Sequence, residues 1–209
     1  MYNIIMMSTL KARGDRRQAL HDHKRQVILG AARAVFLRQG LAGTTMRAIA
    51  DAAGYVAGAV YAYFPTKEAI IGELLVQSLG SLGRAIKTAA GEAGGGRTRL
   101  HAAATALWDY YRANARELPL ALALLQDGGT ALPPETERQV NGRLIALLQA
   151  LAGSLRQAAD LPPPEAEAEA VLLFAAIAGL LLLQASGRLA MLGQDGDALL
   201  ARTVERLPR

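Results

Sequence analysis

Residues 54–68 read GYVAGAVYAYFPTKE, in which small side chains are followed by aromatic ones and then by Pro-Thr-Lys. A solvated helix would carry Glu and Lys in place of the Ala and Gly, and a core helix would carry Leu. On a helix turning about 100° per residue, one side gathers core-forming residues: Val56, Ala59, Val60 and Phe64. The pattern therefore predicts a short helix over 56–64 whose other side lets something large approach the backbone.

That other side carries Ala57 and Gly58, with Tyr61 one turn further on. Small side chains let a helix sink into the DNA major groove, where methyl groups can meet thymine methyls. Tyr61, Tyr63 and Lys67 lie at its rim, where phenol and ammonium groups can bond to phosphates. The alternative is helix–helix packing, because an Ala/Gly face suits that too and a lone lysine is usually solvated.

Two predicted helices precede Gly54. The first runs over residues 22–39, with Asp22 as its N-cap and an apolar stripe on one face: Val27, Ile28, Ala31, Ala32, Val35 and Phe36. Gly40 ends it. The second runs over 45–53, with Thr44 as its N-cap. Two short helices joined by a tight glycine turn, braced by a longer helix, form the helix-turn-helix arrangement.

A fourth predicted helix starts where Pro65 interrupts the chain. Thr66 can cap it and Glu68 suits the positive end of its dipole, so we expect a long helix over 67–89. Beyond the Gly-rich segment 91–96, further helices are predicted over 98–114, 116–126, 134–159, 164–192 and 194–206, separated by Gly and Pro clusters. The frequent Ala, Leu, Gln and Arg favour an all-α fold.

The charge distribution favours a nucleic-acid partner. The chain has 209 residues and a net charge of +5, all of which lies within residues 1–75, whereas residues 76–209 are neutral overall. The alternative is a solubilising basic tail, because four of the ten basic residues there precede Asp22. The chain has no cysteine, which excludes disulfides and thiolate metal sites.

Targeting signals are not expected. The start lacks a basic segment before its short apolar run, so it does not read as a signal peptide. The most apolar run, residues 170–183, is shorter than a bilayer span needs. We therefore expect a cytoplasmic protein with no membrane partner.

Residues 22–82 resemble the DNA-binding domain of TetR-family transcriptional regulators. The resemblance rests on TTMRAIADAAG at 44–54, Gly58, VYAYF at 60–64 and KEAI at 67–70, preceded by Ala32, Phe36 and Gly40. It implies that residues 1–21 are a flexible basic arm, 22–82 the helix-turn-helix domain, and 83–209 a helical ligand-binding and dimerisation domain.

The resemblance also implies roles for single residues. Thr45 would contact phosphate, Arg47 would read a base edge, Tyr61 would contact phosphate or a base, and Tyr63 and Lys67 would contact phosphates. The chain departs from the usual pattern after the turn glycine. Tyr55-Val56 leaves the third helix without a hydroxyl cap, and Ala57 and Ala59 replace the usual polar residues. Recognition is then expected to depend on Arg47, methyl contacts and DNA shape.

The C-terminal part suggests a homodimer. TetR-like proteins dimerise through their last two helices, here 168–192 and 195–206. The run 171–183 is apolar all round, which a second chain would help to bury. The expected interface residues are Val171, Ala175, Ala178, Gly179 and Leu182. The alternative is a core helix within one chain.

An apolar cavity is also predicted in this part. Its expected lining residues are Trp108, Tyr111, Leu122, Leu125, Phe174 and Ile177, although such a set is more often plain core. The sequence contains no catalytic or cofactor motif. A metal cluster is not expected either, because His21 and His23 lie in the presumed arm and His101 is isolated.

These features predict a repressor, not an enzyme. It would leave a palindromic double-stranded operator when a small hydrophobic or amphipathic effector binds. The alternatives are an all-helical adaptor with a basic N-terminal module and a ligand-independent or activating DNA-binding regulator.

Overall fold

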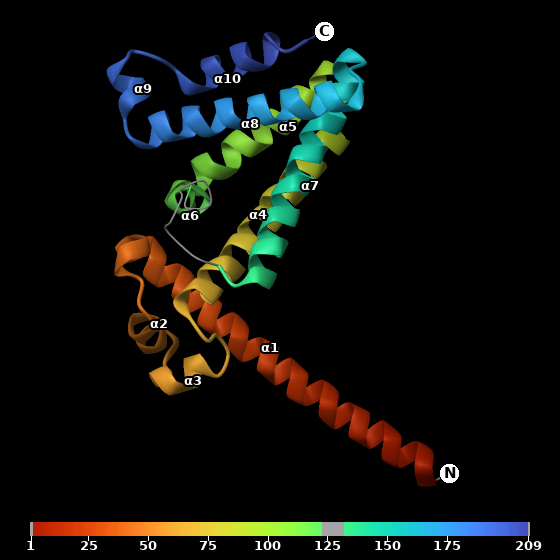
Figure 1. Ribbon diagram of the computed structural model, residues 1–209, viewed down its shortest axis with the longest axis vertical. Coiled ribbons are helices and arrows are strands. Elements are labelled where there is room, and N and C mark those ends of the chain that lie inside the picture. Colours follow the sequence, from red (N-terminus) through yellow and green to blue (C-terminus); the bar gives the residue numbers. More distant parts are fainter. Residues whose placement is uncertain (1, 123–131, 209) are drawn as a thin grey trace. The chain divides into compact units, whose positions relative to one another are not determined.

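The computed structural model describes residues 2–122 and 132–208 of the chain, with side chains from residue 13 onward. These residues form helices and no strand, which confirms the all-α prediction. The chain divides into two units, Met1–Leu74 and Leu75–Arg209 (Figure 1). The division falls inside a helix, eight residues before the boundary expected after residue 82.

The first unit contains α1 (Tyr2–Gly43), α2 (Met46–Ala53), α3 (Ala57–Tyr61) and the first turns of α4 (Lys67–Glu92). Their apolar side chains meet in one core: Ile28, Ala32, Val35, Phe36, Ile49, Val60, Phe64, Ile70, Ile71 and Leu74, all nearly inaccessible to solvent. The predicted stripe of the first helix therefore faces this core, with Val27 and Ala31 at its edge.

The start of α1 differs from the prediction. The helix begins at Tyr2, so Asp22 lies inside it and is not its N-cap, and residues 2–21 are helical. Good helix formers such as Gln, Ala, Leu and Arg fill the turns before Asp22, so the helix can continue through them. Gly40 interrupts the helix as expected, with φ of 70°, before a final turn that ends at Gly43.

The caps of α2 and α3 correct two further expectations. Thr45, not Thr44, is the N-cap of α2, since its Oγ1 accepts a hydrogen bond from the Ala48 amide at 3.1 Å. The Thr44 hydroxyl is buried and donates instead to the Gly40 carbonyl at 2.8 Å. The predicted inward position of Val56 is wrong, because Val56 is the extended N-cap of α3 and is 77% exposed.

Other local signals were correct. Gly54 adopts a left-handed conformation with φ of 71°, which a Cβ would disfavour, and turns the chain between α2 and α3. Val56 provides no side-chain cap, as expected from the missing hydroxyl. Thr66 caps α4 by accepting from the Ala69 amide at 3.1 Å, and Glu68 lies in the first turn.

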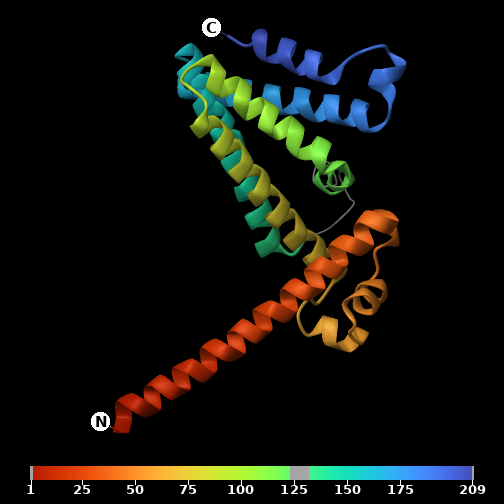
Figure 2. The same cartoon turned by 180° about the vertical axis from the view of Figure 1, so that it is seen from behind.

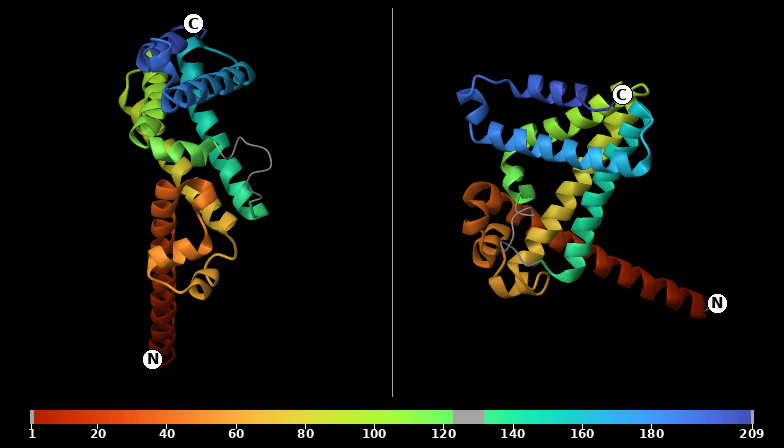
Figure 3. Two further views of the ribbon diagram at one scale, coloured as in Figure 1. Left: turned by 90° about the vertical axis from the view of Figure 1, so that its left-hand side faces the viewer. Right: turned by 45° about the horizontal axis from the view of Figure 1, so that its top comes forward.

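The second unit contains the rest of α4 and the helices α5 (Arg97–Ala113), η1 (Ala115–Glu117), α6 (Leu118–Leu122), α7 (Pro134–Ala159), α8 (Pro163–Ala185), α9 (Arg188–Met191) and α10 (Gly196–Glu205). A single core joins α4, α5, α7, α8 and α10, in which α8 and α10 lie side by side (Figure 3). The predicted helix over 134–159 is confirmed.

The predicted helix over 164–192 is wrong after Ala185. α8 ends at Ala185, and Gly187 with φ of 70° starts the separate short helix α9. Gly187 permits the left-handed conformation that ends α8. The prediction missed this signal because the apolar run before Gly187 suggested one continuous helix. The predicted helix over 116–126 is divided into η1 and α6, and its last residues lie outside the described part.

Candidate DNA-binding surface and ligand cavity

The start of α2 presents two of the predicted DNA-contacting residues. Thr45 and Arg47 are both exposed. The Thr45 oxygen accepts from the Ala48 amide, so its hydroxyl proton remains available for donation to an outside acceptor. Arg47 carries a long side chain with five N–H donors on the same first turn of the helix. This turn can therefore bond to both a phosphate and a base edge.

The outer face of α3 is bare, as predicted. Gly58, Tyr61 and Ala62 are exposed, and Tyr61 retains about half of its accessible surface. Ala57 is half-buried and so contributes less of this face than expected. Val56 adds an exposed branched side chain at the start of the helix. Sequence reasoning missed it because a helical projection was applied to a residue that precedes the helix.

Tyr63 and Lys67 lie where the chain passes from α3 into α4. Both are half-buried. The Tyr63 ring contacts the His21 ring of α1, with centroids 4.9 Å apart. Lys67 is the first residue of α4, immediately after its Thr66 cap. Their contacts with DNA remain predictions, since the structure contains the protein chain alone.

Arg25 holds this junction in place, a role that sequence reasoning missed. Its guanidinium donates to the Tyr63 carbonyl at 3.2 Å and to Glu73 at 2.8 Å, and it lies over the Phe64 ring at 4.2 Å. Arg25 occurs one turn before Ile28 and in line with the apolar stripe. The sequence signal for this role was the position of Arg25 in line with the apolar stripe, which places it at the border of the core.

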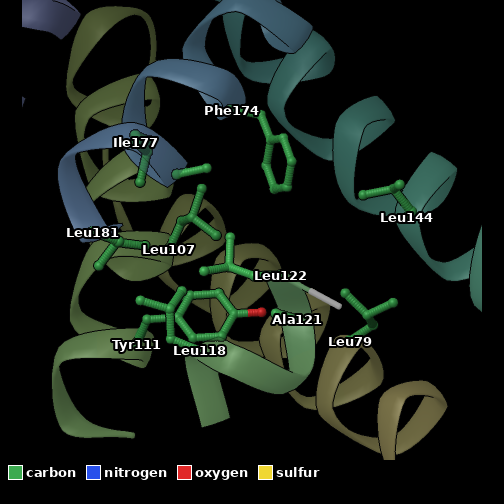
Figure 4. A pocket seen from close by; sticks show the side chains of 11 residues that line it. Leu79, Leu107, Tyr111, Leu118, Ala121, Leu122, Leu144, Phe174, Ile177 and Leu181 are labelled. Carbon is green, nitrogen blue, oxygen red and sulfur yellow. The ribbon is translucent and has the colours of Figure 1, made fainter. Parts of the chain in front are cut away.

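The second unit encloses a small apolar cavity of about 30 Å³ (Figure 4). Its lining consists of Leu79, Leu107, Tyr111, Leu118, Ala121, Leu122, Leu144, Phe174, Ile177, Ala178 and Leu181. Four of the six predicted pocket residues are in this set: Tyr111, Leu122, Phe174 and Ile177. Leu125 lies outside the described residues. The volume is well below the several hundred Å³ of a typical ligand site.

Among the described residues that line the cavity, Tyr111 alone has a polar side chain. Its ring meets that of Tyr110 edge-on, with centroids 5.3 Å apart. Burial, and secondarily the nearby Tyr110 and Glu117, raises the pKa of Tyr111 well above its usual value. The hydroxyl, red in Figure 4, therefore stays protonated and can donate to an acceptor.

Trp108 does not line the cavity. It is buried, donates from Nε1 to Asp197 Oδ1 at 2.7 Å, and packs closely against Gly196. Asp197 also accepts from Arg112 at 2.7 Å. Trp108 therefore connects α5 to the start of α10. It belongs to the core, although Tyr111, three residues further along α5, lines the cavity.

One face of α8 remains exposed although the helix is apolar all round. Val171, Leu172 and Leu182 each keep at least half of their surface accessible, and Ala175 and Gly179 are exposed between them. Of the predicted interface residues only Ala178 is half-buried, and it lines the cavity.

α4 and α8 are both long and apolar enough to cross a membrane by length and composition, a test that core helices also pass.

No metal centre is formed by the residues that the structure describes, since no three His, Asp or Glu side chains gather at one place there.

A helix-turn-helix unit followed by a separate all-helical unit is an arrangement that suits a DNA-binding regulator. Residues 28–74 match the family model described as bacterial regulatory proteins, tetR family, and residues 100–207 match the model described as tetracyclin repressor-like, C-terminal domain. The chain belongs to the TetR family. Its family thus identifies it as a regulator.

Similar proteins extend this result. The chain is 42% identical over 52 residues to the HTH-type transcriptional repressor KstR2 of Rhodococcus jostii (strain RHA1), a match that covers 25% of this chain and 26% of that protein. It thus spans about a quarter of the curated relatives it matches.

Two solved structures share the fold. A Rhodococcus protein of unknown function has a TM-score of 0.71 with 22% identity, over 88% of this chain and 93% of that one. The regulator FadR from Bacillus subtilis, solved with stearoyl-CoA, has a TM-score of 0.67 with 19% identity, over 87% and 96%.

Proposed function

We propose that this protein is a cytoplasmic, homodimeric repressor that binds a near-palindromic DNA operator and leaves it when an amphipathic effector binds. The observation that carries the proposal is the outer face of α3, where Gly58 and Ala62 are exposed and Tyr61 is half accessible. Such a face can enter a major groove closely. The 42% identity of this chain to a KstR2 repressor over 52 residues supports the repressor role.

Each head would divide its contacts between phosphates and bases. Thr45, Tyr63 and Lys67 occur at helix starts and at the junction into α4, positions suited to phosphate contacts that fix the register. Arg47 is the exposed long basic side chain on α2 and would read a base edge. Ala57 and Gly58 would allow the approach.

The exposed face of α8 would form the dimer interface. Val171, Leu172 and Leu182 leave a contiguous apolar surface on a helix of 23 residues, which a second copy of α8 would remove from water. A two-fold dimer presents two α3 helices, so half-sites would be separated by about one helical turn of DNA, or a multiple of it.

The cavity indicates the chemistry of the effector. Its lining is apolar except for Tyr111, which fits an elongated apolar molecule with one hydrogen-bond acceptor. Its present volume is too small for such a molecule. Effector binding would therefore favour a conformation with an expanded cavity, and release follows if that conformation binds DNA less well. Stearoyl-CoA is a suitable first probe, because FadR of similar fold was solved with it.

Selection from random DNA, followed by titration with a panel of acyl-CoA thioesters and other amphipathic molecules, tests the proposal. We expect a near-palindrome to be enriched and one class of probe to weaken its binding. An adaptor would enrich no sequence, a ligand-independent regulator would ignore the panel, and an activating regulator would bind DNA more tightly with the effector. Tyr111→Phe should lower effector affinity by about 0.5–1.5 kcal/mol, with Tyr55→Phe as the matched control.

A further inference from the structure

The N-terminal part of α1 separates its charges by side. On an ideal helix four basic side chains fall within an arc of about 80°: Arg13, Arg17, His21 and Lys24. Arg16 and His23 lie about 60° and 80° beyond this arc. The two carboxylates of this part, Asp15 and Asp22, project about 180° to 200° from Arg13, and Asp22 Oδ1 lies 3.6 Å from His21 Nδ1 at the edge of the set. We call the four-residue set the basic face of α1. Such sorting is not required by packing, since residues 13–23 are exposed.

The basic face begins at the DNA-reading surface. His21 contacts the Tyr63 ring, and one turn later Arg25 donates to the Tyr63 carbonyl. The side of α1 that carries these residues is therefore the side that meets the end of α3. Arg17 lies one turn and Arg13 two turns before His21, about 6 and 12 Å along the helix axis. Figure 2 shows this part of α1 projecting beyond α2 and α3.

The two arginines are free to bind an outside partner. Within the described residues neither Arg13 nor Arg17 forms an ion pair or a hydrogen bond, whereas Arg25 in the same row is fully engaged. Leu20, beside them, is 55% exposed, so no other part of the described chain covers this stretch. A guanidinium fork binds phosphate oxygens well because two of its N–H groups match their spacing.

We propose that the basic face of α1 binds the DNA phosphates that flank each half-site, as a continuation of the contacts made by Tyr63. This inference rests on the proposed function and enlarges the footprint of each head. The contacts would be independent of sequence, because phosphates carry no base information. They would therefore contribute affinity and salt dependence without altering the selected sequence.

The test compares the wild-type chain with Arg13→Gln/Arg17→Gln, both at full length. Glutamine keeps helix propensity and removes the charge. The matched control is Arg116→Gln/Arg156→Gln, which removes two exposed charges from the second unit. Binding to a 40-base-pair duplex of fixed arbitrary sequence is measured between 50 and 300 mM salt, and circular dichroism checks that helix content is unchanged.

We expect the slope of log affinity against log salt to become shallower by about 1.8 per chain in the Arg13/Arg17 variant, since each lost phosphate contact accounts for about 0.9. The control should keep the wild-type slope. Equal slopes for the two double variants would overturn the inference while leaving the proposed function intact. If the wild-type chain enriches no sequence from random DNA and binds no duplex, the proposed function is refuted instead.

Discussion

The helices α3 and α8 both expose residues that are mostly not polar, but the exposed side chains differ in size. α3 shows Gly58 and Ala62 beside the half-exposed Tyr61, and the polar groups of Arg47 and Lys67 belong to the helices on either side of it. α8 shows large branched side chains at Val171, Leu172 and Leu182. Small groups with a polar border suit a hydrated, charged groove, whereas large apolar groups suit another apolar surface.

An exposed apolar face can therefore belong to a DNA-binding surface or to a protein interface. Side-chain size and the chemistry at the border distinguish DNA from a second protein chain. Substitutions on the two faces test this distinction, and substitutions where α10 packs on α5 test the core behind the α8 face.

Gly179→Arg should dissociate the dimer completely at micromolar concentration. A Cβ at Gly179 meets nothing within 4 Å in the single chain, so the substitution should not disturb the fold of the protomer. Within an apolar interface the added charge would lose its hydration without gaining a partner. Light scattering should fall from twice the 22.1 kDa chain mass to a single chain mass.

Gly142→Arg is the matched control, since Gly142 is exposed on α7 with equally open space around it. It should remain dimeric. A Gly179→Arg protein that stays dimeric would place the interface elsewhere and leave the α8 face without its proposed partner.

Arg47→Ala and Lys67→Ala should separate base reading from phosphate binding on the α3 side. Arg47→Ala should cost about 1–3 kcal/mol per head and relax the preference at one position of each half-site. Lys67→Ala should weaken all sequences alike and reduce the salt slope by about 0.9 per head. Selection from random DNA with each variant, at two salt concentrations, measures both effects. An unchanged sequence preference after Arg47→Ala would make Arg47 a phosphate contact.

Gly196→Ala should destabilise the second unit without affecting the α8 face. A Cβ there would lie 2.6 and 2.8 Å from two ring atoms of the buried Trp108, which has no space to move away. Overpacking of this kind costs about 1–3 kcal/mol of unfolding free energy. Urea unfolding followed by fluorescence of the single tryptophan measures it.

The matched control for this prediction is Gly142→Ala, because a Cβ at Gly142 meets nothing within 4 Å. This substitution should stabilise α7 by about 0.4–1 kcal/mol. If Gly196→Ala were as stable as the wild-type protein, the close packing of α10 on α5 would be wrong. Loss of the dimer by Gly196→Ala at concentrations where it remains folded would connect this contact to the interface.

The first unit was predictable because its signals are local. Gly54 requires its own left-handed turn, Thr66 caps the helix that follows it, and Val60 and Phe64 share a face by helical period alone. Two errors there were shifts of a single position, Thr44 for Thr45 and the placement of Val56, because a cap residue lies outside the helical geometry applied to it. The larger error was the start of α1, which lies at Tyr2 and not at Asp22, because no residue before Asp22 stops the helix.

The second unit was less predictable because its decisive contacts join distant residues. Trp108 bonds to Asp197, 89 residues further along the chain, and nothing near Trp108 indicates this partner. α8 is apolar on all sides, so its sequence cannot show which side faces the core. Four of the cavity residues were nevertheless identified, since bulky apolar residues on facing helices tend to enclose space.

Asp197→Asn should give the smallest effect, and only above acidic pH. The hydrogen bond from Trp108, followed by that from Arg112, holds the pKa of Asp197 below its usual value. A carboxylate with a lowered folded-state pKa adds stability above its unfolded-state pKa, and this contribution is lost as the pH falls through the folded-state pKa. Because Asp197 and Arg112 are largely exposed, the loss at pH 7 should lower the thermal midpoint by no more than about 2–4 °C. The wild-type and Asp197→Asn midpoints should converge as the pH is lowered from about 5 to below 3. A difference that persists unchanged at low pH would show that the asparagine alters the packing around Trp108 rather than the charge, and would remove the electrostatic link between α5 and α10.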